Sequence, residues 1–118
     1  MKRLVFLKGR FESSRESVLS QDADHDFFDR AYEHLRVANE QLTGVPQGQV
    51  SASMMYACAR FNAWVSATNR DSAKDLKGAY GETIEYFVAQ YRKMLVTNLD
   101  DFVAHFAEYM EPGAARKS

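Results

Sequence analysis

The chain has 118 residues, of which 46 % are hydrophobic and 26 % charged, and these values predict one soluble globular domain rather than a disordered chain. A single cysteine, Cys58, excludes an intramolecular disulfide and fits a reducing cytoplasm. No apolar run approaches the roughly 18 residues that span a bilayer. The apolar run after Arg3 covers only residues 4–7, shorter than the roughly 7–15 residues of a signal-peptide core. We therefore expect a cytoplasmic protein without a transmembrane segment.

The net charge of −1 is unevenly distributed along the chain. Residues 1–20 contain five Lys or Arg residues and two Glu residues, which gives a net charge of +3. Residues 21–111 contain eight Lys or Arg residues and fourteen Asp or Glu residues, which gives a net charge of −6. An acidic body repels phosphate, so nucleic acid is not an expected partner. We expect a basic, flexible extension over residues 1–21, a helical domain over residues 22–111 and a frayed tail over residues 112–118.

Apolar residues at three- and four-residue spacing predict the first two helices. The first covers residues 24–43, with several Asp residues near its start, where they complement the helix dipole, and with Gly44 after it. The second starts with Ser51 as its N-cap and covers residues 52–67, which are apolar on most faces of the helix. A helix of this kind is usually the buried centre of a bundle.

A two-residue link follows, so the third helix is expected to fold back antiparallel on the second. Ser72 and Asp75 have the spacing of a capping box, and an apolar stripe then runs from Leu76 to Leu95. Gly81 predicts a break between a short helix and a long one. Asn98 is expected to cap a last helix. The sequence thus predicts an all-α fold, a compact antiparallel bundle of about four helices.

Two stretches of the sequence resemble a family of small bacterial proteins. The first is VSASMMYACARFNA at residues 50–63, and the second combines IEYF at residues 84–87, QYRKML at residues 90–95 and NLDD at residues 98–101. In these motifs the chain resembles the family catalogued as domain of unknown function 3144, over about Asp26 to Met110. The resemblance implies a bacterial, cytoplasmic protein, and it supplies no activity, ligand or catalytic residue.

The sequence carries no recognisable catalytic or metal-binding pattern. His25 and His34 lack the spacing of a two-His zinc helix, although Asp101 and His105 are four residues apart and could share a metal. Cys58 lies in the apolar centre of the second helix, where a thiol is typically a small buried hydrophobe. We therefore expect no catalytic residue, no cofactor and no metal site.

Arg60 and Asn62 stand out as polar residues of the second helix, where burial requires a partner. Glu82 and Glu85 of the third helix are natural partners of Arg60, which predicts a structural ion pair between the two helices. A polar pocket is the alternative interpretation. Its candidate binding residues are Arg60, Asn62, Trp64, Glu85, Tyr86 and Arg92.

These observations leave several functions open. Aromatic residues form 13 % of the chain, and Tyr or Trp exposed together would form an interface patch. The first hypothesis is accordingly a non-catalytic protein–protein interaction module that binds another protein or itself as a homo-oligomer. The second is a small-molecule-binding protein or enzyme with a polar pocket around Arg60 and Glu85. A third gives the basic extension a contact with nucleic acid or a membrane surface.

Overall fold

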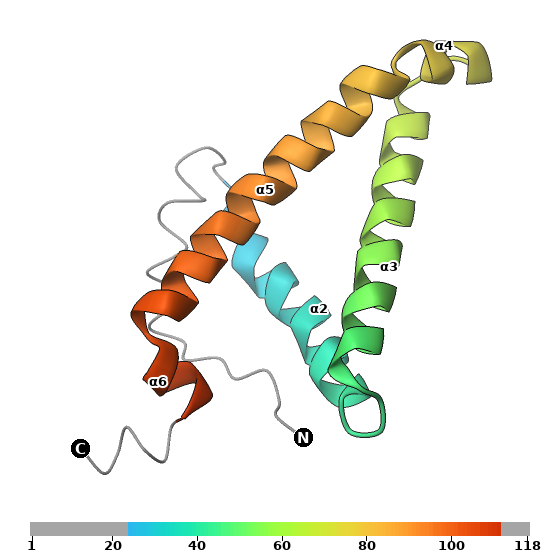
Figure 1. The fold of residues 1–118 in the computed structure, drawn as a ribbon. Helices are drawn as coiled ribbons and strands as arrows, with labels where there is room; N and C mark the ends of the chain where they lie inside the picture. The colour runs from blue at the N-terminus through green and yellow to red at the C-terminus, as the bar shows by residue number, and fades with distance from the viewer. Residues whose placement is uncertain (1–23, 112–118) are drawn as a thin grey trace.

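The computed structural model describes residues 24–111 (Figure 1), and the expectations for residues 1–21 and 112–118 lie outside these residues. No strand occurs among the described residues, so the predicted all-α class is confirmed. None of the helices described combines the length and apolar character needed to cross a lipid bilayer. The helices are α2 (Phe27–Gln41), α3 (Gln47–Thr68), α4 (Ala73–Gly78), α5 (Tyr80–Ala104) and α6 (Phe106–Met110).

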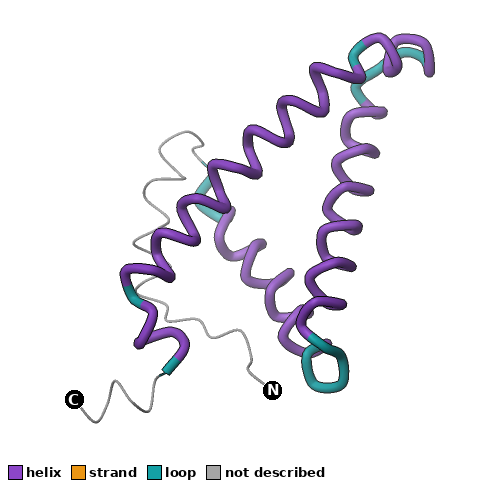
Figure 2. Tube along the Cα trace, in the orientation of Figure 1, coloured by secondary structure: helices purple, strands orange, loops and turns teal. Residues whose placement is uncertain are grey.

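The helices form an open arrangement in which each packs mainly on its neighbour in sequence (Figure 2). The long helices α3 and α5 meet at α4 and diverge away from it. The Cα radius of gyration is 17.2 Å, whereas a compact domain of this length has roughly 13–14 Å. The fold therefore differs from the expected compact bundle, because α4 forms a corner that keeps the faces of α3 and α5 apart.

The packed core of the described fold lies where α2 meets the start of α3. Ala38, Leu42 and Val50 are buried together, and Val45 and Met54 pack against them, partly buried. Their spacing of four residues within each helix places them on one face. The turn between α2 and α3 therefore holds a buried apolar cluster that joins the two helices.

Two helix starts differ from the predicted ones. Helix α3 begins at Gln47 with Pro46 at its N-cap, so Ser51 lies inside the helix rather than capping it. Helix α5 continues to Ala104, and the Asn98 side chain donates a 2.7 Å hydrogen bond to the Met94 carbonyl instead of capping a new helix. Both predicted N-caps were therefore wrong. At Ser51 the helix starts four residues earlier, and at Asn98 a side chain that can cap a helix bonds instead to the turn before it.

The corner between α3 and α5 follows the prediction closely. The Ser72 hydroxyl caps α4 by accepting a 3.1 Å hydrogen bond from the Asp75 backbone N–H. Asp75 in turn accepts a 3.1 Å bond from the Asp71 backbone N–H. The predicted break near Gly81 is confirmed, since α4 ends at Gly78 and α5 begins at Tyr80.

Candidate interaction surface

Helix α3 carries an apolar face that extends beyond its contact with α2. Val50 and Met54 form the start of this face and pack against the end of α2. Phe61 and Trp64 continue it, since they follow at helical spacing, and each of these two side chains is 60 % exposed. Their ring centroids are 5.5 Å apart. The expectation that this helix is the buried centre of a bundle is therefore wrong for the half of α3 that follows Met54.

Helix α5 carries a second exposed apolar face, which we call the α5 stripe. The stripe consists of Tyr80, Ile84, Val88, Tyr91, Leu95 and Leu99, all exposed. Its spacing of three and four residues keeps it on one side of the helix over roughly 28 Å. Four of its six residues belong to the apolar stripe that the sequence predicts between Leu76 and Leu95, where Phe87 is expected in place of Val88. Leu76 and Phe87 are partly buried, whereas the α5 stripe is exposed among the described residues.

The exposed area on these two helices is large. Four aromatic side chains on the two faces, Phe61, Trp64, Tyr80 and Tyr91, are half or more exposed, and each such side chain holds roughly 150–250 Å² of surface. Together they present on the order of 500 Å², more than half of the roughly 800 Å² that each partner buries in a standard protein interface. Tyr56 and Tyr86 are also exposed but lie on other sides of α3 and α5. Apolar exposure on this scale is typical of interaction surfaces.

Three polar side chains, Asp101, His105 and Tyr109, meet at the C-terminal end of α5, and we call this cluster the clasp. Nδ1 of His105 lies 3.1 Å from Oδ1 of Asp101, and the Tyr109 hydroxyl donates a 2.7 Å hydrogen bond to Oδ2 of the same carboxylate. Tyr109 is only 4 % exposed, and its ring stacks at 4.6 Å on that of Phe102. The spacing of Asp101 and His105 thus serves a contact between α5 and α6. No group of three or more metal-ligating side chains occurs in residues 24–111.

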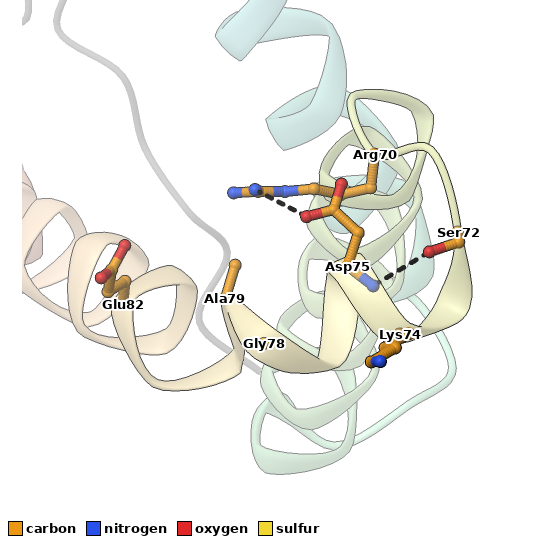
Figure 3. A pocket seen from close by; sticks show the side chains of 7 residues that line it. All are labelled: Arg70, Ser72, Lys74, Asp75, Gly78, Ala79 and Glu82. Carbon is orange, nitrogen blue, oxygen red and sulfur yellow. Dashed lines mark hydrogen bonds and ion pairs between the residues drawn. The ribbon is translucent and has the colours of Figure 1, made fainter.

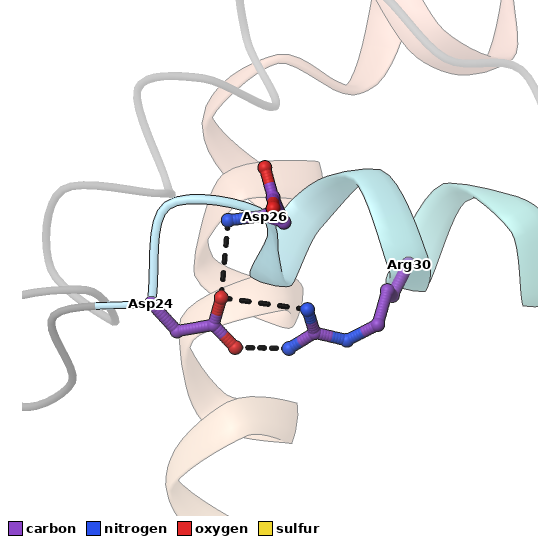
Figure 4. Close-up of polar contacts among 3 residues, drawn as sticks. All are labelled: Asp24, Asp26 and Arg30. Atoms are coloured by element: carbon purple, nitrogen blue, oxygen red, sulfur yellow. Dashed lines mark hydrogen bonds and ion pairs between the residues drawn. The ribbon is translucent and has the colours of Figure 1, made fainter.

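Asp24 organises the start of α2 (Figure 4). Its carboxylate accepts hydrogen bonds from the Arg30 guanidinium, one of them 3.4 Å long, and a 3.1 Å bond from the Asp26 backbone N–H. The hydrogen bond from Arg30 holds the pKa of Asp24 below its ordinary value of 3.8, because it favours the ionised carboxylate. The acidic start of this helix is therefore a specific ion pair as well as a favourable charge near the helix dipole.

An open hollow of about 510 Å³ lies at the corner formed by α4 (Figure 3). Arg70 and Asp75 cross it as an ion pair, with 3.5 Å between Nη1 and Oδ1. Its other lining residues are Ser72, Lys74, Gly78, Ala79 and Glu82. These polar contacts hold the corner together, and none of the six candidate binding residues lines the hollow.

Comparison with known proteins places this architecture in a family. Residues 27–103 match the model of a family described as a protein of unknown function, DUF3144. The chain belongs to this family. The NMR structure of the protein NB7890A from Shewanella sp is 33 % identical to it, with a TM-score of 0.62, and the match covers 72 % of this chain and 91 % of that chain. The comparison with curated proteins found no match.

The DUF3144 region includes both exposed apolar faces and all six candidate binding residues. Arg60, Asn62 and Trp64 lie on α3, while the other three lie on α5. Arg60 and Glu85 are exposed, and no ion pair joins them among the described residues of this DUF3144 chain. The predicted pairing of these two side chains across the helices is therefore not found, and a binding role for the six residues stays a prediction.

Within this DUF3144 fold, two further positions refine the sequence-based picture. Cys58 is exposed rather than buried, since no described helix covers that part of α3. Asn62 is partly buried, and its amide nitrogen lies 3.4 Å from the Cys58 sulfur. The clasp of Asp101 with His105 and Tyr109 was missed by the sequence reasoning, although its spacing of four residues between successive members was a visible signal.

Proposed function

We propose that this protein is a non-catalytic helical interaction module that self-associates through the apolar faces of α3 and α5. The exposed α5 stripe is the observation that carries this proposal. Removing apolar surface of this extent from water is the main driving force of protein association. The polar contacts described support a non-catalytic role, because those at α4 and α6 hold helices in place.

A second copy of the same chain is the occupant that the structure favours. The described fold buries six hydrophobic residues below a tenth of their surface, and none of the described side chains is fully buried. A core this small stabilises a single chain only weakly. Chains of this kind complete their core by association, and obligate homodimers often have no stable folded monomer. A second copy is present wherever the chain is made, and it carries the same apolar faces.

We also propose the cytoplasm as its location, on the basis of the single cysteine and the reducing compartment that such a composition fits. This proposal is independent of the self-association, and fractionation of cells that produce the full chain would test it.

Sedimentation velocity over a wide range of protein concentration tests the self-association. The expected result is a species of two or more chains that dissociates on dilution, with loss of helical circular dichroism if the isolated chain unfolds. Trp64→Glu should shift the equilibrium toward the dissociated chain, because it places a charge on the apolar face of α3. Met55→Glu is a matched control, since Met55 is 55 % exposed and lies nine residues before Trp64, on the opposite side of α3. A fully helical monomer at every concentration would overturn the proposal.

A further inference from the structure

Glu85 and Arg92 flank the α5 stripe on the same side of the helix. They are seven residues apart, or two helical turns. Both side chains are exposed, and neither forms an ion pair with another residue of the described range 24–111. Between them, Ile84, Val88 and Tyr91 follow at four and three residues, the spacing of a heptad seam. The stripe therefore presents an apolar seam with one acidic and one basic side chain along a single edge.

We propose that two copies of the chain pair antiparallel along α5, with Glu85 of each copy bound to Arg92 of the other. The inference rests on the proposed self-association and names its interface. In an antiparallel seam of this register, Ile84 lies opposite Leu95 of the second copy, and Val88 lies opposite Tyr91 of the second copy. The two-fold symmetry of the dimer repeats each of these two contacts once more. The same register brings the edge residues Glu85 and Arg92 together twice, because like edges of antiparallel helices face each other.

The charges select this orientation over a parallel one. A parallel seam would bring Arg92 near Phe87 of the second copy and Glu85 near Tyr80 of the second copy, so no opposite charges would meet. Antiparallel pairing satisfies both charges at the rim of an apolar seam, where complementary charges fix partner and register more than they raise affinity. The four seam side chains themselves, Ile84, Val88, Tyr91 and Leu95, are 41–53 % exposed, so about half of the surface of each remains for a partner.

Helix α3 has no pair of opposite charges beside its apolar face. Arg60 is its only charged residue between Gln47 and Thr68. A self-pair along α3 therefore has no complementary charge pattern that would select an orientation. The pattern on α5 is thus the feature that identifies the central contact.

Charge reversal in the full chain tests the pairing. Glu85→Arg and Arg92→Glu should each weaken dimerisation by about tenfold or more, because each places like charges opposite at two symmetric sites. The double variant should recover most of the wild-type affinity, since it exchanges the two partners. Sedimentation velocity measures the dissociation constants, and circular dichroism reports the helix content. Glu82→Arg and Lys93→Glu are matched controls, because they make the same charge changes on the far side of α5 from the seam.

Mixing the two single variants gives a second measurement that does not depend on either variant folding alone. In the antiparallel heterodimer, the two edge positions of the Glu85→Arg chain are both arginine and face two glutamates of the Arg92→Glu chain. Native mass spectrometry should therefore show the heterodimer in large excess over both homodimers. Single variants that dimerise like the controls, or a mixture without heterodimer preference, would overturn the α5 pairing while self-association stands. A wild-type chain that stays monomeric would overturn the proposed function as well.

Discussion

The hydroxyl of Tyr109 lies 2.7 Å from Oδ2 of Asp101 and donates a hydrogen bond to it across the junction of α5 and α6. The other oxygen of the same carboxylate faces Nδ1 of His105. One partly buried carboxylate thus receives contacts from two side chains that follow it by four and eight residues. Since α6 has only five residues, too few to hold a helix by its own backbone bonds, this contact explains how α6 keeps its place.

Removing the hydroxyl of Tyr109 should destabilise the fold. Tyr109→Phe keeps the buried ring but takes one donor from the Asp101 carboxylate, and a hydrogen bond to a charged group contributes about 1.5–3 kcal/mol. We expect a lower urea midpoint of unfolding with an unchanged slope. Tyr56→Phe is the control, because its hydroxyl belongs to a 70 % exposed side chain. Equal midpoints for the two variants would contradict the role assigned to this bond.

Acidification should weaken the start of α2. The pKa of Asp24 is lowered in the folded chain by its hydrogen bond from Arg30, so the ionised carboxylate stabilises the fold at pH values above the ordinary pKa of 3.8. This contribution is lost as the pH falls through the lowered pKa. An NMR titration of the Asp24 carboxyl carbon should give a lower midpoint in the wild type than in Arg30→Gln. Identical midpoints would mean that the ion pair does not form in solution.

Loss of the cap on α4 should weaken the corner between α3 and α5. Ser72→Ala removes the acceptor of the Asp75 backbone N–H, and the loss of a serine N-cap typically costs about 1 kcal/mol. Urea unfolding measures the change. Ser51→Ala should leave the free energy of unfolding nearly unchanged, because Ser51 is an exposed residue inside α3. A larger effect at Ser51 than at Ser72 would restore the N-cap that the sequence suggested.

The contact between α2 and α3 should depend on Leu42. Leu42 is 7 % exposed and packs with Ala38 and Val50, so Leu42→Ala should cost about 2–5 kcal/mol by leaving a cavity. Val37→Ala is a suitable control, since Val37 is 44 % exposed on the same helix. Thermal unfolding followed by circular dichroism compares the two, and a similar loss for both would argue against the assigned core.

Much of the secondary structure could be predicted because it depends on neighbours in sequence. The N-cap at Ser72 and the break before Tyr80 follow from residues within one or two turns, and both were predicted. Helix starts were harder to predict where one side chain has two possible local hydrogen bonds. The Asn98 side chain, for example, donates to the Met94 carbonyl instead of capping a new helix. Periodicity also identified four of the six residues of the α5 stripe as an apolar face, because a helix repeats every 3.6 residues whatever surrounds it.

The sequence alone therefore determined the all-α class, most of the helices and the faces that seek a partner. It also led to the family, through motifs that lie on α3 and α5. Only the tertiary structure decided which faces are covered. The corner at α4 directs α3 and α5 apart, so Arg60 does not reach Glu85 and Cys58 stays exposed. Helical periodicity says that a face must be buried, whereas the angle between two helices, and hence the partner, depends on contacts made in three dimensions.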